Sequence, residues 1–178
     1  EFFYESLEDD KAAYISKIKN LVINEAKNNP HICISHTIAQ ACLETGYGNS
    51  TLSKKHNNHF GIKYIKSDFV KGKIEMETFE FYDKVNDGKK NKNSSKVKVS
   101  EKADFCTYTS LENSIKHRSE FLKRDYYAIL SEKAYKYRAD YKKYCEFFKR
   151  TPYATDPKYT ERIIKIINIV MLRYGYFL

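Results

Sequence analysis

Apolar residues in the first part of the chain recur at helical spacing. After the acidic positions 8–10, an apolar residue follows every three to four positions, at Ile15, Ile18, Val22 and Ala26. This period predicts a helix over about residues 9–27, and Asn28-Asn29-Pro30 ends it. We expect this helix to pack against the next one and to carry no chemistry itself.

The second predicted helix covers about residues 34–45 and has two distinct faces. Its apolar face holds Ile34, Ile38 and Cys42, whereas Thr37, Gln40, Ala41 and Glu44 share the other face. Gly46 and Gly48 end the helix, so Glu44 stands at its C-terminal end. The helix dipole and partial burial both raise the pKa of a carboxyl in that place. Such a group can protonate a leaving oxygen, although a solvated Glu before a C-cap is the plainer interpretation.

A different pattern begins after residue 62. Residues 74–82 alternate apolar and polar positions, residues 96–100 alternate again, and Asn86-Asp87-Gly88 between them is typical of a turn. We therefore predict a β-hairpin lobe over about residues 62–105, with a lysine-rich solvated loop over residues 86–102. The period of two places Glu75 and Glu77 on one face and Glu80 on the other.

Helical signals return in the second half. Ser50 is a candidate N-cap for a short turn over residues 52–55, and Ser110 for a helix that reaches about Arg124. Asp156 and Pro157 similarly begin a last helix. A stripe at helical spacing is predicted to be core, and it consists of Tyr141, Tyr144, Cys145 and Phe148. The prediction is a mainly α (α+β) protein.

Composition limits the function. The 178 residues fit one domain over 1–178, and the net charge of +9 suits either a lysine-rich solvated surface or attraction to a polyanion. Zinc-ligand spacing and RNA-binding aromatic boxes are missing from the sequence, so a nucleic-acid partner is disfavoured. Sixteen Tyr and eleven Phe suit a sugar site.

The cysteines and histidines do not indicate a metal site. Cys33, Cys42, Cys106 and Cys145 form no C-x-x-C pair, and we expect buried free thiols. His56 and His59 are three residues apart without a carboxylate motif, so no metal or other cofactor is predicted. The sequence contains no transmembrane run, and its abrupt start at Glu1 leads us to expect a domain from a longer protein.

Three short boxes stand out in the sequence, at residues 39–50 (AQACLETGYGNS), 56–63 (HNNHFGIK) and 153–157 (YATDP). The first two resemble the boxes AQA-hydrophobic-LES-G-W-G-x-S and NN-x-FGIK of bacterial cell-wall glucosaminidases (glycoside hydrolase family 73). The third is identical to the YATDP box of that family. His59 replaces a usually apolar residue, and Pro152 replaces the usual Gly. The resemblance extends from about Ile32 to the C-terminus.

The resemblance implies a lysozyme-like helical lobe and a small hairpin lobe across a glycan cleft. It implies an endo-β-N-acetylglucosaminidase that acts on peptidoglycan, with Glu44 as general acid and Tyr153 supporting the site. Thr78-Phe79-Glu80 resembles the T-x-E of the family, which makes Glu80 the second carboxylate and leaves Glu77 as its rival. The 56–63 loop is implied to be structural. Substrate contacts are predicted for Gln40, Tyr47, Asn58, Phe60 and Thr155.

Several questions stay open at this point. The alternatives are a lytic transglycosylase or muramidase on the same fold and a wall-binding module without turnover. The parent protein is expected to be an autolysin, a toxin-like effector, a flagellar component or a phage lysin, secreted or held at the cell wall or virion. We expect a monomer whose partners are glycan strands and the anionic wall. The reaction is inverting, retaining or assisted by the N-acetyl group of the substrate.

Overall fold

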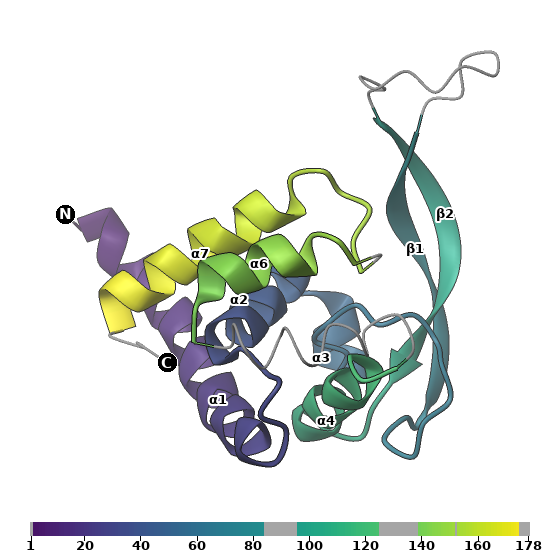
Figure 1. Cartoon of the computed structure of the whole chain (residues 1–178), viewed down its shortest axis with the longest axis horizontal. Coiled ribbons are helices and arrows are strands. Elements are labelled where there is room, and N and C mark those ends of the chain that lie inside the picture. Colours follow the sequence, from purple (N-terminus) through teal and green to yellow (C-terminus); the bar gives the residue numbers. More distant parts are fainter. Residues whose placement is uncertain (1, 84–95, 125–138, 152, 175–178) are drawn as a thin grey trace.

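A computed structural model describes residues 2–83, 96–124, 139–151 and 153–174 of the chain. A group of helices forms one lobe, and a long two-stranded hairpin stands beside it (Figure 1). The helices are α1 (Phe2–Asn28), α2 (Ile34–Thr45), α3 (Thr51–His56), α4 (Leu111–Phe121), α6 (Tyr141–Phe148) and α7 (Tyr159–Tyr174). This arrangement confirms the predicted mainly α fold with a hairpin lobe.

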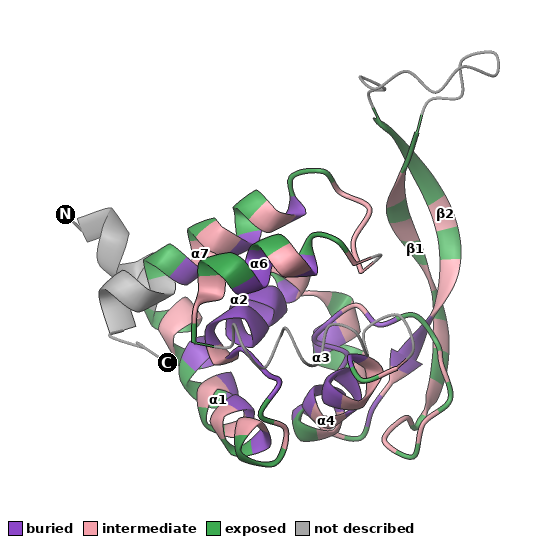
Figure 2. Ribbon diagram, in the orientation of Figure 1, coloured by how far each residue is buried: buried purple, intermediate pink, exposed green. Residues whose placement is uncertain are grey.

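Helix α2 lies at the centre of the helical lobe, and α1, α6 and α7 pack around it. Its Ile38, Ala41 and Cys42 belong to one hydrophobic cluster with α1 and the start of α4, as predicted for the packing of α1. Its Ala39 and Leu43 belong to a second cluster with α6 and α7. Figure 2 shows α2 buried along most of its length. The end of α2 is therefore held rigidly, because neighbours fix it on two sides.

The hairpin consists of β1 (Gly72–Asp83) and β2 (Lys96–Thr107), paired antiparallel from Gly72 opposite Thr107 to Asp83 opposite Lys96. The return strand is longer than the predicted 96–100, because its pairing with β1 continues to Gly72 opposite Thr107. An isolated bridge between Lys63 and Phe105 lies at the base of the hairpin. Burial alternates along β1 as predicted, with Glu75 and Glu77 exposed and Glu80 on the opposite, less exposed face. Of the predicted lysine-rich loop over residues 86–102, residues 86–95 lie outside the described residues, and residues 96–102 belong to β2 instead of a loop.

Helix boundaries show where local signals mislead. Helix α1 begins at Phe2 rather than near residue 9, since the acidic residues that suggested a start lie inside the helix. Helix α2 spans Ile34–Thr45 as predicted, and Ser50 and Ser110 cap α3 and α4 through their side chains. Helix α4 ends at Phe121, three residues before the predicted end.

The loop between α3 and the hairpin is built on one asparagine. The Asn58 side chain donates to the carbonyls of Ile62 and Cys106 and accepts from the backbone N–H groups of Phe60 and Ile62. Phe60 is fully buried. The prediction of a structural loop is confirmed, because a buried backbone that turns here needs these partners.

Three further predictions concern the cysteines, the stripe on α6 and membranes. All four cysteines are buried free thiols, as expected. Three residues of the stripe on α6 are core as predicted, since Tyr144, Cys145 and Phe148 are buried in the second cluster, whereas Tyr141 is only partly buried against it. Within the described part of the chain, no helix combines the length and the apolar character that a membrane crossing requires.

Candidate active site

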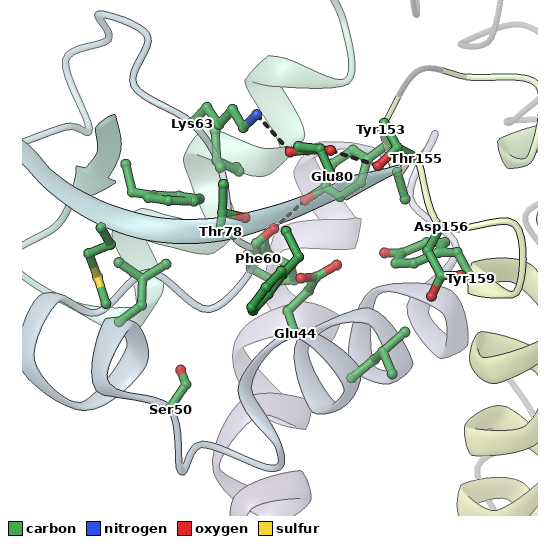
Figure 3. Close-up of a pocket in the computed structure, with 18 of the residues that line it drawn as sticks. Glu44, Ser50, Phe60, Lys63, Thr78, Glu80, Tyr153, Thr155, Asp156 and Tyr159 are labelled. Atoms are coloured by element: carbon green, nitrogen blue, oxygen red, sulfur yellow. Dashed lines mark hydrogen bonds and ion pairs between the residues drawn. The ribbon is translucent and has the colours of Figure 1, made fainter. Parts of the chain in front are cut away.

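A pocket of about 1000 Å³ lies where the hairpin meets the helical lobe. Its lining comes from the end of α2, the loop over residues 60–65, strand β1 and the segment 153–159 (Figure 3). Of the predicted site residues, Glu44, Phe60, Glu80, Tyr153 and Thr155 line this one pocket. Segments far apart in the sequence thus converge around two carboxylates.

Glu44 is the next-to-last residue of α2, and its carboxyl points into the pocket (Figure 3). Its pKa is raised from an ordinary value of 4.5 to about 7, because burial, the largest cause, and the charge of Glu80 together outweigh the opposite effect of the Tyr159 hydroxyl. Gly61 faces the carboxyl so closely that a Cβ there would lie 3.1 Å from Glu44 Oε2. Gly61 also has a φ of +62°, which glycine adopts without strain. The side chain is therefore a carboxylic acid that keeps its proton close to neutral pH.

Glu80 lies on β1 in a different electrostatic environment. Lys63 Nζ lies 2.7 Å from Glu80 Oε1, and the Thr155 hydroxyl donates to Glu80 Oε2 at 2.6 Å (Figure 3). Burial would raise the Glu80 pKa, but the hydrogen bonds from Lys63 and Thr155 and the charge of Lys63 lower it below its usual value. Glu80 is thus held ionised. The rival Glu77 is exposed on the opposite face of β1, although it also borders the pocket.

The segment before α7 connects the two walls of the pocket. Thr155 donates to Glu80 and its hydroxyl also accepts from the backbone N–H of Phe81 at 3.0 Å. The Tyr153 hydroxyl donates to the carbonyl oxygen of Phe60 at 2.6 Å. Asp156 was predicted to begin the last helix, and its side chain does accept from the N–H of Lys158, although α7 itself starts at Tyr159.

Three predicted substrate-binding residues lie elsewhere. Among the described residues, the pocket lining does not include Gln40, Tyr47 or Asn58. Gln40 and Asn58 are buried and use their amides within the protein. Tyr47 packs against the first cluster with the ammonium of Lys11 4.9 Å from its ring centre. The structure therefore does not place these three side chains at the pocket, because each is engaged within the protein away from it.

Tyr159 lines the same pocket as Glu44, and the sequence did not mark it as a site residue. It is the first residue of α7, and its hydroxyl accepts a hydrogen bond from the Gln40 amide at 2.8 Å. Nothing in its local sequence separates it from an ordinary core tyrosine of a first helical turn. Only the packing of α7 on α2 brings it to the pocket.

The pair of carboxylates defines what this site can do. A protonated Glu44 can donate to a leaving oxygen, and an ionised Glu80 can accept a proton from water or stabilise positive charge. In the described segments, no cluster of three or more His, Cys, Asp or Glu side chains could hold a metal ion. The arrangement is that of a glycoside hydrolase site.

Comparisons with known proteins agree with this site. A family model described as mannosyl-glycoprotein endo-beta-N-acetylglucosaminidase matches residues 19–172, and the chain belongs to this glucosaminidase family. The exo-glucosaminidase LytG of Bacillus subtilis is 31% identical over 141 residues, which is 78% of this chain and 44% of LytG. The peptidoglycan hydrolase FlgJ of Vibrio cholerae is 25% identical over 160 residues, which is 89% of this chain and 43% of FlgJ. The chain thus spans less than half the length of these curated relatives.

Solved structures share the fold. The catalytic domain of the autolysin Auto from Listeria monocytogenes superposes with a TM-score of 0.68 at 24% identity, covering 93% of this chain and 87% of that domain. A structure described as an N-acetylmuramoyl-L-alanine amidase from Staphylococcus aureus gives a TM-score of 0.72 at 28% identity, covering 92% of this chain and 42% of that one. The predicted family and fold are confirmed.

Proposed function

We propose that the chain is a peptidoglycan hydrolase that cleaves the β-1,4 bond between N-acetylglucosamine and N-acetylmuramic acid. The observation that carries this proposal is the pair of carboxylates in one pocket, with the Glu44 pKa raised to about 7 and the Glu80 pKa lowered. Two carboxyls whose pKa values are shifted in opposite directions are suited to be the acid and the base of a glycosidase. The named relatives that hydrolyse peptidoglycan support the substrate class.

In this mechanism Glu44 donates its proton to the glycosidic oxygen as the bond to the sugar breaks. Glu80, held ionised by Lys63 and Thr155, removes a proton from the attacking water or places that water. Tyr153 lines the pocket next to the loop of Phe60 and orients the substrate or water. An alternative step uses the N-acetyl oxygen of the substrate as internal nucleophile, and Glu80 then matters less.

The net charge of +9 fits action at an anionic cell wall. Electrostatic attraction would hold the protein near its substrate and weaken as salt rises. We infer that the protein works outside the cell or in the wall, as an autolysin, flagellar or phage enzyme.

The test is the clearing of purified peptidoglycan, followed by mass spectrometry of the new ends. Wild type is compared with Glu44→Gln, Glu80→Gln and the rival Glu77→Gln, and Glu75→Gln, exposed on β1 and outside the pocket lining, is the matched control. We expect Glu44→Gln to lose about 10²–10⁴-fold in rate and Glu75→Gln to keep wild-type rate. Reducing N-acetylglucosamine ends would support the proposal.

Other products would select the alternatives. Anhydro-muramic ends would indicate a lytic transglycosylase, and reducing muramic ends a muramidase. Release of single sugars from chain ends, rather than internal cuts, would indicate an exo mode like the one named for LytG. Wall binding without turnover by wild type would indicate a binding module and refute the proposed hydrolysis, and so would cleavage of a mannosyl-glycoprotein glycan with no cleavage of peptidoglycan.

A further inference from the structure

Strand β1 presents one of its edges to the pocket. Six consecutive residues of the strand, 76–81, line the pocket, although successive residues of a strand point to opposite faces. Residues of both faces border the same pocket because the strand turns its edge toward it. Figure 3 shows this strand, which carries Thr78 and Glu80, along the wall across from Glu44. Strand β2 pairs with the other edge of β1, so the pocket edge has no strand partner among the described residues.

The register of the hairpin identifies the backbone groups that point outward at this edge. Opposed residues of an antiparallel pair alternate between exchanging their N–H and C=O groups with each other and directing them outward. Phe81 directs its N–H outward, because this N–H donates to the Thr155 hydroxyl at 3.0 Å. The register is uninterrupted from one end of the hairpin to the other. Phe79 and Glu77, two and four residues before Phe81, therefore also direct their N–H and C=O groups outward.

The far side of the hairpin gives an independent check. The carbonyl of Asp104 accepts from the N–H of Tyr64 at 2.8 Å, on the edge of β2 that faces away from β1. Asp104 is opposite Glu75, which places Glu75 in the same outward-pointing set as Glu77 and Phe79. Within the part of the chain that the structure describes, no hydrogen bond uses the outward N–H and C=O groups of Glu77 and Phe79. Four unused backbone groups therefore face the pocket.

The side chains beside this edge form a row of acid, ring and base. Glu77, Phe79 and Lys98 share one face of the hairpin and all line the pocket. Phe79 is 57% exposed, and Lys98 Nζ lies 4.3 Å from the centre of its ring. Neither Glu77 nor Lys98 forms an ion pair within the described ranges. Both signs of charge and an apolar ring thus stand next to the unused backbone groups.

An extended peptide is the ligand that matches such an edge. Each residue of an extended chain directs its N–H and C=O groups to the same side, so it exchanges two hydrogen bonds with one strand residue. This holds for L and D residues alike, because the two are mirror images. The acetamido group of a sugar is a single trans amide whose N–H and C=O point in opposite directions, so it uses only one of them at this edge.

We propose that the pocket edge of β1 at Glu77 and Phe79 binds the peptide stem of peptidoglycan through backbone hydrogen bonds. This inference rests on the proposed function and deepens it, because the preferred substrate becomes a glycan that still carries its stems. The stem bears carboxylates, which Lys98 complements, and an amino group where its third residue is lysine or diaminopimelate, which Glu77 complements. The ring of Phe79 packs against the apolar parts of the stem.

Amide hydrogen exchange in the full chain tests the edge directly. Isotope-labelled wild type is measured by NMR with and without a soluble stem peptide, L-Ala–γ-D-Glu–L-Lys–D-Ala, at saturation. We expect exchange of the Glu77 and Phe79 amides to slow about fivefold, which is the effect of one added hydrogen bond. The Glu75 amide points outward in the same way but lies outside the pocket lining, so its exchange should not change.

Proline substitutions test the same groups through activity. Phe79→Pro removes an outward N–H and no hydrogen bond of the hairpin, and proline is tolerated at such edge positions. Phe79→Ala is its matched control, because it loses the ring and keeps the N–H. Glu75→Pro controls for proline at an equivalent outward position away from the pocket. Each variant is given intact peptidoglycan and the same material from which an amidase has removed the stems.

The effect should depend on the stems. On intact peptidoglycan we expect the apparent KM of Phe79→Pro to be about three- to tenfold higher than that of Phe79→Ala, with similar kcat. On the stripped glycan the two variants should not differ. Glu75→Pro should match wild type on both substrates.

The outcomes distinguish this inference from the proposed function. Exchange of the Glu77 and Phe79 amides that stays unchanged with the stem peptide overturns the inference, even if peptidoglycan is cleaved. An equal loss by Phe79→Pro on both substrates assigns the edge to the glycan and also overturns it. Protection of the two amides without cleavage of peptidoglycan by wild type supports the edge and refutes the proposed function. If Phe79→Pro does not fold, the exchange measurement on wild type decides.

Discussion

Substitution of Gly61 tests how closely the protein packs around the Glu44 carboxyl. Its φ is +62°, and a Cβ at this position would lie 3.1 Å from Glu44 Oε2 and 3.7 Å from Glu44 Cδ. Gly61→Ala therefore introduces two perturbations, a strained backbone and a methyl group against the carboxyl. Gly46→Ala introduces only the first, because Gly46 has a φ of +55° and nothing within 4 Å of its Cβ position.

The two effects have different magnitudes and different readouts. An L-residue in the left-handed region costs about 1–2 kcal/mol, so both variants should lose similar stability, with Tm lower by roughly 2–8 °C. A contact of 3.1 Å is tighter than an ordinary one, so Glu44 must move by a few tenths of an ångström in Gly61→Ala. Misplacement on this scale at a catalytic group should lower the rate about tenfold.

Cleavage of purified peptidoglycan at a temperature well below both Tm values gives the comparison. Thermal unfolding by circular dichroism measures the shared backbone cost. A tenfold lower rate in Gly61→Ala, with Gly46→Ala near wild type, is the expected result. Equal rates in the two alanine variants would refute the reasoning that Gly61 is glycine to make room for the Glu44 carboxyl.

Three further predictions concern titrating groups. Because the Glu44 pKa is raised from 4.5 to about 7, the wild-type protein loses folding stability as pH rises through that window, by ~3 kcal/mol at most. Urea unfolding should therefore show Glu44→Gln to be more stable than wild type at pH 8 but not at pH 4.5. Lys63→Met should raise the Glu80 pKa and move the acid limb of activity toward neutral pH, whereas Lys73→Met, at an exposed ion pair, should leave it in place. Burial lowers the pKa of His31 to about 4, so the contribution of neutral His31 to folding stability is present above pH 6.5 and is lost as pH falls toward 4. After subtraction of the Glu44 effect, a urea unfolding midpoint that stayed constant from pH 7 to pH 4.5 would contradict this.

The sequence predicted what depends on neighbours along the chain. Helix α2, its C-cap at Gly46 and the place of Glu44 follow from periodicity and glycine signals within a dozen residues. The face of Glu80 follows from the period of two in β1. These elements were predictable because local backbone geometry alone decides them.

Contacts between residues far apart in the sequence could not be predicted from such local signals. Gln40 and Tyr159 are 119 positions apart, and Gln40 and Arg118 are 78 apart. Gln40 was predicted to contact substrate because it shares a helical face with Glu44. Periodicity places a residue on a face but does not say whether that face meets solvent or another helix, and here α7 covers Gln40.

The order in which the site residues occur along the chain has a consequence for how activity arises during synthesis. Glu44 stands near the end of α2, whereas Thr155, which donates to Glu80, and Tyr159, which lines the pocket, come late in the chain. A nascent or truncated chain that stops before Thr155 would hold both carboxylates and still lack this wall of the pocket. We therefore expect the proposed hydrolysis to begin only when this last segment has docked.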